Sequence, residues 1–154
     1  MAVYFTDSSA VVKRYVQETG SVWVSGLFTA APANSIAVVS ITSVKVVAAI
    51  TRRVHSGTIT QADATSSCAL FLADLNTDYR VVPITDALLR QAIQLAQLYS
   101  LRGYDAVQLA AANEVSRLRV TAGATPLIFV SADNELNAAA RNEGLSMDDP
   151  NAHV

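Results

Sequence analysis

Residues 2–16 read AVYFTDSSAVVKRYV, and this stretch decides the class of fold. The apolar run at residues 2–6 predicts a buried strand. Asp7 and the two serines after it offer side-chain oxygens that cap a helix, and apolar residues then recur at the spacing of one helix face. A strand that passes directly into a helix is therefore expected at the start of the chain.

The same alternation of short apolar runs and longer helical patterns continues to the end of the chain. Further strands are expected at residues 36–40, 79–83 and 127–130. Helices are expected at residues 21–28, 41–53, 60–75, 85–99 and 104–118, with a last one opening at Asp133. Parallel strands need crossover connections, and continuous apolar runs suit strands that are covered on both faces. The sequence predicts a three-layer α/β fold, with a mostly parallel sheet of four or five strands flanked by helices.

Length, charge and cysteine content narrow the class of protein. The 154 residues are enough for one domain, which we expect to span residues 1–147, with residues 148–154 as a frayed tail. The formal net charge of -2 excludes a global basic field, so any polyanionic partner must be held by a local surface. The single cysteine, Cys68, allows no internal disulfide, and neither a basic leader nor an apolar membrane span is evident. We therefore expect a cytoplasmic protein without a membrane partner.

Three acidic residues lie where a parallel sheet places its functional groups. Asp7 follows the first strand, Asp133 follows the fourth, and Asp105 lies in the first turn of a helix. Ligands of such sheets bind beyond the carboxyl ends of the strands. Taken singly, each aspartate is better explained as a helix cap. Three carboxylates converging there would repel one another, so the group as a whole predicts a hard divalent cation, Mg²⁺ or Mn²⁺.

Four segments together resemble a known family. They are residues 4–13, 40–50, 101–110 and 129–133, in the order and at the approximate spacing of the PIN-domain ribonucleases, most closely the VapC-type toxins of bacterial toxin–antitoxin pairs. The resemblance implies a parallel sheet flanked by helices and a site in which acidic residues gather around Mg²⁺ or Mn²⁺. Asp7, Asp105 and Asp133 match three of those acidic positions. Ser9 and Ser131 match small polar residues that support the site.

The resemblance also implies how such a site works and with what the protein assembles. The metal neutralises charge on a phosphodiester and lowers the pKa of the water that attacks it. Asp7 and Asp133 would be metal ligands, and Asp105 a ligand or the group that orients the water. RNA as the substrate, a small antitoxin as a protein partner and a homodimer follow from the resemblance alone. Apolar side chains of the first two helices are candidates for the antitoxin surface, or equally for the core: Val12, Tyr15, Val22, Trp23, Leu27 and Phe28.

One position departs from the family pattern. Lys45 stands where the family carries a metal-site glutamate, in the helix after the second strand. On residue type alone, a lysine on an amphipathic helix is ordinarily a solvated surface residue. An ammonium among Asp7, Asp105 and Asp133 would instead neutralise one carboxylate and compete with a metal ion for space. We therefore expect low metal affinity and ribonuclease activity that is weakened or absent.

Cationic and aromatic residues near the motifs are candidates for contacts with single-stranded RNA. They are Arg102, Tyr104, Lys13, Arg14, Arg52 and Arg53. Ordinary surface solvation explains any one of them taken alone. Arg102 is the strongest candidate because it directly precedes a helix start beside Asp105.

Other functions of α/β proteins remain to be weighed. A receiver domain needs an acidic pair near the first strand and a lysine after the last one, and an aspartyl phosphatase needs Asp-x-Asp after the first strand. The chain has Asp7-Ser8-Ser9 there, which disfavours both. Neither His55 nor His153 has a second ligand at metal-binding spacing. The open alternative is a catalytically inactive PIN-like binding module that sequesters an antitoxin or binds RNA without cutting it.

Overall fold

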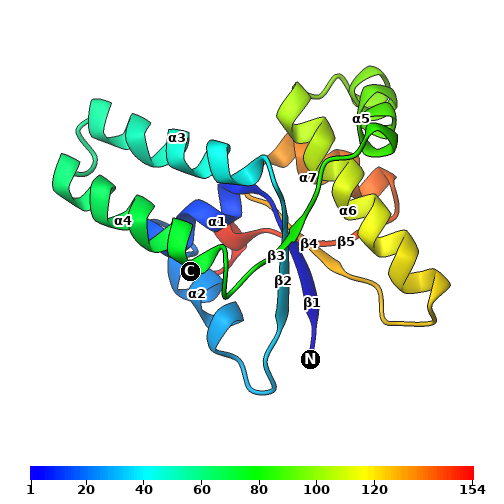
Figure 1. Ribbon diagram of the computed structural model, residues 1–154, viewed down its shortest axis with the longest axis horizontal. Coiled ribbons are helices and arrows are strands. Elements are labelled where there is room, and N and C mark those ends of the chain that lie inside the picture. The colour runs from blue at the N-terminus through cyan, green and yellow to red at the C-terminus, as the bar shows by residue number, and fades with distance from the viewer.

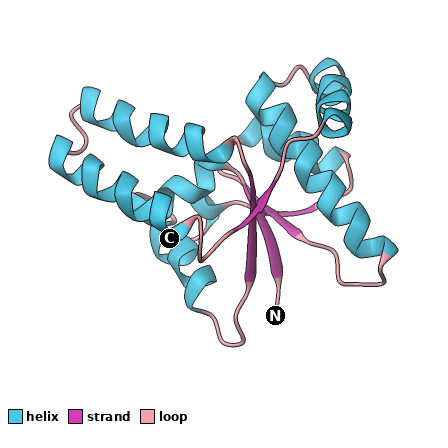
Figure 2. Ribbon diagram, in the orientation of Figure 1, coloured by secondary structure: helices cyan, strands magenta, loops and turns pink.

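The computed structural model describes residues 1–154 and contains one five-stranded sheet (Figures 1 and 2). The strands are β1 (Val3–Thr6), β2 (Ser35–Val39), β3 (Arg80–Val82), β4 (Ile128–Val130) and β5 (Ser146–Asp148). They lie in the order β3-β2-β1-β4-β5, and every neighbouring pair is parallel. Tyr4 of β1 is in register with Ile36 of β2 and with Ile128 of β4. The predicted parallel sheet is confirmed, with β1 at its centre.

Seven α-helices connect and cover the strands. They are α1 (Ser8–Tyr15), α2 (Ser21–Thr29), α3 (Thr42–His55), α4 (Gln61–Asp74), α5 (Asp86–Tyr99), α6 (Gly103–Thr121) and α7 (Asn134–Asn142). Figure 1 shows α1 to α4 on one side of the sheet and α5 to α7 on the other. Four of the helices begin at a side-chain cap, in which Asp7, Thr60, Thr85 or Asp133 accepts a hydrogen bond from the backbone N–H three residues on. The predicted three-layer α/β architecture is confirmed.

The core is divided by the sheet because neighbouring side chains of a strand point to opposite faces. In β2, Ile36 and Val38 pack with α1, α3 and α4, whereas Ala37 and Val39 pack on the face covered by α5 to α7. All four side chains are buried. Burying both faces of a strand requires an uninterrupted apolar run, which is why residues 36–39 do not alternate with polar residues.

The C-terminal residues are ordered, contrary to the frayed tail expected for residues 148–154. Residues 146–148 form the edge strand β5, and Pro150–Ala152 forms a short 3-10 helix in which Pro150 is buried. The sequence did not indicate this strand because SMD has neither an apolar run nor a β-branched residue. Pairing of its backbone with β4 makes it a strand.

Contacts with α2 hold this C-terminal segment. The His153 ring stacks on Trp23 with 4.1 Å between ring centroids, and His153 Nε2 lies 2.7 Å from Asp148 Oδ1. Gly20 has a φ of +84°, and a Cβ at this position would lie 2.3 Å from the Pro150 carbonyl oxygen. The close approach therefore requires glycine on both conformational and steric grounds.

None of the helices combines the length and the apolar character needed to cross a bilayer.

Candidate functional site

The candidate site lies at the carboxyl ends of β1 and β4, the two central neighbours in the sheet (Figure 1). Asp7 follows β1 directly, and its backbone N–H donates to the Val130 carbonyl at 3.1 Å. Ser131 and Asp133 follow β4, and Asp133 begins α7. Parallel pairing thus brings residues from opposite ends of the chain to one edge of the sheet, as open α/β sheets do for their ligands.

Asp7 is the buried centre of the site, with only 2% of its surface exposed. Its Oδ1 accepts hydrogen bonds from Ser9 Oγ at 2.6 Å and from the Ala10 N–H at 3.1 Å, and its Oδ2 accepts one from Ser131 Oγ at 3.0 Å. Burial raises the pKa of Asp7 to about 6, since desolvation of the carboxylate outweighs these three hydrogen bonds, and the charge of Asp105 acts in the same direction as burial.

The two serines connect Asp7 to the turn after β4. Ser9 Oγ accepts a hydrogen bond from the Ala132 N–H at 2.9 Å, and Ser131 Oγ accepts one from the Asp133 N–H at 3.0 Å. Each hydroxyl therefore donates to the Asp7 carboxylate while accepting from a backbone N–H of the turn after β4. The structure places Ser9 and Ser131 beside Asp7.

Asp105, Asp133 and Lys45 lie close enough to act on one another electrostatically. Burial and then the charge of Asp133 raise the pKa of Asp105, while Lys45 and Arg102 lower it. The Lys45 ammonium also lies 5.2 Å from the centroid of the Tyr104 ring, across the space between α3 and α6. Lys45 therefore contributes a positive charge to the acidic region rather than extending into solvent as a surface lysine does.

The donor chemistry suits a hard cation, but the arrangement of the carboxylates does not. No group of three or more His, Cys, Asp or Glu side chains is arranged to hold a metal ion. Both Asp7 oxygens accept hydrogen bonds, and Asp133 Oδ1 caps α7 by accepting from the Leu136 N–H at 3.0 Å. The positive charge of Lys45 further disfavours a divalent cation beside Asp105. The residues present therefore do not fit a bound Mg²⁺ or Mn²⁺.

The fold was compared with solved structures, after no protein-family model and no curated protein matched the sequence. VapC20 from Mycobacterium tuberculosis, described as a sarcin–ricin loop cleaving toxin, aligns with a TM-score of 0.61 and 17% identity over 88% of this chain and 94% of its own. VapBC2 from Rickettsia felis, bound to a DNA fragment from its promoter, aligns with a TM-score of 0.59 and 13% identity over 96% and 98%. A toxin–antitoxin complex from Klebsiella pneumoniae aligns with a TM-score of 0.60 and 16% identity over 97% and 98%. This chain has a VapC-type PIN fold.

In this PIN fold, a buried polar side chain links the elements that carry the site. Gln108 is fully buried one turn after Asp105 on α6. Its Nε2 donates to Ser8 Oγ at 3.4 Å, and its Oε1 accepts from Thr42 Oγ1 at 3.5 Å. Gln108 was not predicted from the sequence, because its two partners are distant along the chain, although a glutamine on the apolar face of a helix was a signal. These bonds join the beginnings of α1 and α3 to α6.

Two residues predicted to contact RNA form contacts within the protein instead. Lys13 is buried, and its ammonium donates to Glu18 Oε1 at 3.2 Å and to the Thr19 carbonyl at 2.9 Å. Arg14 stacks over the Phe28 ring at 3.8 Å and forms an ion pair with Asp78 at 2.6 Å. Both side chains are held by intramolecular contacts that a nucleic acid would have to break, so the structure disfavours these two candidates.

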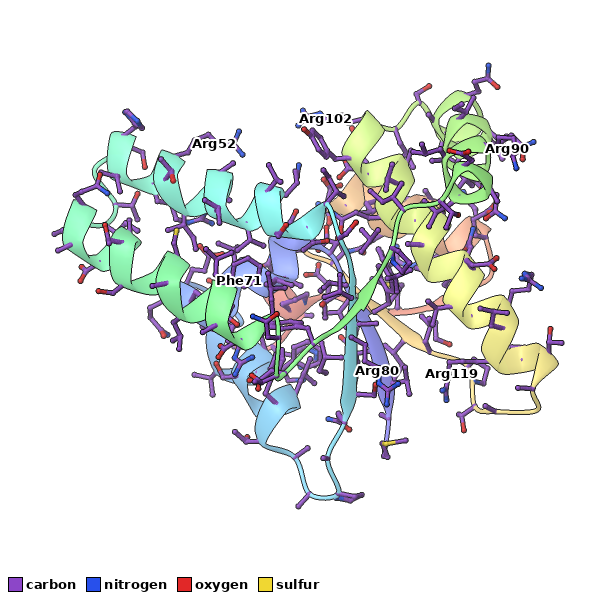
Figure 3. All side chains as sticks on the ribbon, in the orientation of Figure 1. Arg52, Phe71, Arg80, Arg90, Arg102 and Arg119 are labelled. Carbon is purple, nitrogen blue, oxygen red and sulfur yellow. The ribbon has the colours of Figure 1, made fainter.

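Two of the other four predicted contacts, Arg102 and Tyr104, are exposed at the start of α6. Figure 3 shows Arg102 at the rim of the molecule beside this helix start. The Tyr104 ring is 47% exposed although it contacts Lys45. Both side chains are therefore available to a ligand that approaches Asp105.

Proposed function

We propose that this chain is a toxin-type nuclease whose Mg²⁺- or Mn²⁺-dependent hydrolysis of RNA phosphodiesters is weakened or lost because of Lys45. The VapC-type PIN fold supports the nuclease class, and VapC20, which has the same fold, is described as cleaving the sarcin–ricin loop. Asp7, Asp105 and Asp133 are the proposed catalytic and metal-site acids, with Ser9 and Ser131 in support. With Lys45 in place these residues do not fit a metal ion, so the charge neutralisation and activated water that a metal supplies require an acid at position 45.

The observation that carries this proposal is the charge of Lys45 next to the acids. Lys45 acts on the Asp105 carboxylate in the direction opposite to Asp133. A glutamate at position 45 would change the local charge by two units and add a carboxylate, which is the ligand type that Mg²⁺ and Mn²⁺ prefer. The lysine therefore lowers metal affinity by removing one ligand and by repelling the ion.

The test is the substitution Lys45→Glu, assayed for Mn²⁺ binding by calorimetry and for cleavage of single-stranded RNA. We expect the substitution to create or strengthen Mn²⁺ binding and to give RNA cleavage that EDTA abolishes. The matched control is Arg90→Glu, which makes the same change of charge at an exposed position on α5, away from the site (Figure 3). If Lys45→Glu is as inert as the original chain in both assays, the proposal of an impaired nuclease is wrong.

A second candidate function is an inactive binding module that sequesters an antitoxin or binds RNA without cutting it. The occupied Asp7 and Asp133 oxygens favour it, since helix capping and hydroxyl contacts already explain both residues. Mn²⁺ titration separates the two functions. Metal binding by the original chain or by Lys45→Glu supports the nuclease, whereas no binding by either supports the module.

An antitoxin protein and a second copy of this chain are the proposed protein partners, in the cytoplasm. Exposed apolar side chains support protein contacts: Val44 and Leu72 on α3 and α4 are 56% and 48% exposed, and Leu89 and Ile93 on α5 are 42% and 59% exposed. Most of the apolar side chains of α1 and α2 that were candidates for the antitoxin surface are not exposed to solvent. Fewer of these residues are therefore available to contact an antitoxin. Val12 and Leu27 are buried, Tyr15, Trp23 and Phe28 are half-buried, and Val22 is 81% exposed.

A further inference from the structure

A pocket of about 260 Å³ lies between α1 and α3, beside the acidic site. Four cationic residues line it, Lys13, Lys45, Arg52 and Arg53, and a single anionic one, Glu18. The start of α1 and the turn after β4 complete its wall. The whole chain carries a net charge of -2, so this concentration of positive charge is local.

Contacts within the pocket leave two of its cations unpaired. The Glu18 carboxylate is shared, with Oε1 3.2 Å from Lys13 Nζ and Oε2 2.9 Å from Arg53 Nη2. Lys45 and Arg52 have no carboxylate within 4.0 Å and make no side-chain hydrogen bond. The one anion of the pocket is thus used by two cations, and the charges of Lys45 and Arg52 remain available to a ligand.

The two free cations lie on one face of α3. Lys45 and Arg52 are seven residues apart, which is two helical turns or about 10 Å of rise. Ala49, between them on the same face, also lines the pocket, and its small side chain leaves the space above it open. Figure 3 shows Arg52 extending outward from α3. Lys45, at the inner end, contacts the exposed Tyr104 ring and acts on Asp105.

We propose that this pocket binds the phosphate backbone of single-stranded RNA, with Lys45 and Arg52 each contacting one phosphate group, and that Tyr104 stacks on a neighbouring base. The choice of RNA rests on the proposed function. Lysine and arginine donate charge-assisted hydrogen bonds to phosphate oxygens, and proteins that bind single strands combine a cationic groove with exposed aromatic rings. An acidic peptide would use the same cations, but it would leave the exposed Tyr104 ring without a stacking partner.

Lys45 thereby has two effects. The residue that weakens the metal site also holds the polyanion beside it, so loss of cleavage and retention of RNA binding have one physical cause. Lys45 at the inner end and Arg52 at the outer end would direct the strand along α3 toward Asp105.

Binding of a fluorescein-labelled oligonucleotide of twelve uridines, measured by anisotropy in EDTA, tests the pocket without cleavage. Each phosphate contact to a single strand contributes a slope of roughly 0.7 to the dependence of log K on log salt. Loss of one contact therefore weakens binding about five-fold at about 0.1 M salt and flattens the slope by roughly 0.7. We expect these changes for Arg52→Ala, and a similar loss for Lys45→Met.

The matched control is Arg90→Ala, since Arg90 is also an exposed helical arginine without an ion pair but lies on α5. We expect it to leave the affinity and the salt slope unchanged. Thermal unfolding verifies that each variant is folded, which is expected for Arg52 because its side chain is exposed. If Arg52→Ala and Arg90→Ala have the same effect on binding, the pocket is not a phosphate site.

A peptide of eight glutamates, titrated under the same conditions, provides the test against a protein ligand. Tighter Arg52-dependent binding of this peptide than of the oligonucleotide would overturn the assignment to RNA. The result is independent of the metal experiment. Because Lys45→Glu also removes a proposed phosphate contact, Mn²⁺ binding rather than cleavage separates the two proposals. If Lys45→Glu fails to bind Mn²⁺ while Arg52-dependent RNA binding of the original chain in EDTA persists, the nuclease proposal fails and the pocket stands. If Lys45→Glu binds Mn²⁺ but Arg52→Ala leaves RNA binding unchanged, only the pocket proposal fails.

Discussion

The substitution Asp7→Asn should stabilise the protein at neutral pH, because Asp7 carries a buried charge. Its pKa is raised from 3.8 in an unfolded chain to about 6 in the folded one. A raised carboxyl pKa means that the folded state holds the proton more tightly, so stability is fully present below pH 4 and is lost as the pH rises to about 6. A shift of about two units corresponds to a loss of about 3 kcal/mol above that range.

Asparagine retains most of the local contacts while removing the charge. Its Oδ1 can accept the bonds from Ser9 Oγ and the Ala10 N–H, whereas its amide would face Ser131 Oγ as a donor. Reversing that one hydrogen bond costs about 1 kcal/mol at every pH. We therefore expect Asp7→Asn to be less stable than the original chain by about 1 kcal/mol near pH 4 and more stable by about 2 kcal/mol near pH 7.5.

Urea unfolding in EDTA at the two pH values measures this difference. The other titrating groups contribute to both proteins and largely cancel when the free energies of unfolding are subtracted. Asp86→Asn is the control, because Asp86 is an exposed acid in the first turn of α5 and its replacement should change stability by less than about 0.5 kcal/mol. A free-energy difference between Asp7→Asn and the original chain that is the same at both pH values would refute the reasoning.

Two further predictions concern the C-terminal segment and the base-stacking surface. Gly20→Ala should destabilise the fold by about 1–3 kcal/mol and change the fluorescence of Trp23, because the new Cβ clashes with Pro150 where the segment packs on α2. Gly57→Ala is its control, since Gly57 has a φ of +76° in open space, and an unchanged Trp23 signal in Gly20→Ala would contradict the assigned contact. Tyr104→Ala should weaken oligouridine binding at least about five-fold, from a stacking energy of roughly 1–3 kcal/mol, whereas Tyr104→Phe should not; equal affinities of these two variants would exclude stacking.

The candidate site was predictable where local sequence and topology act together. Asp7 and Asp133 follow strands, and residues at the ends of adjacent parallel strands must meet at one edge of the sheet. Lys45 was recognised only because a resemblance placed an acid at its position, since residue type alone indicates a surface lysine. Gln108 and the pocket around Arg52 were not predictable in this way, because their partners come from separate elements.

The sequence also did not show which charged side chains already have an intramolecular partner. Lys13 and Arg52 have the same charge and both lie on helices near the motifs. In the structure, Lys13 is buried against Glu18, whereas Arg52 is exposed without an ion pair. The folded contacts of Lys13 with Glu18 and Thr19, and the lack of any such contact at Arg52, distinguish a cation that stabilises the fold from one that is available to a ligand.

The sequence by itself determined the parallel α/β sheet, because apolar periodicity and helix caps act between residues that are close along the chain. It also determined that Asp7 and Asp133 lie at the same edge of that sheet. Only the tertiary structure decided that β5 orders the C-terminal residues, that both Asp7 oxygens are already bonded, and that the carboxylates do not form a metal cage. These outcomes depend on contacts between separate segments, from β4 with β5 to the bond between Ser131 and Asp7, which are 124 residues apart, and such contacts are fixed by packing rather than by any local pattern.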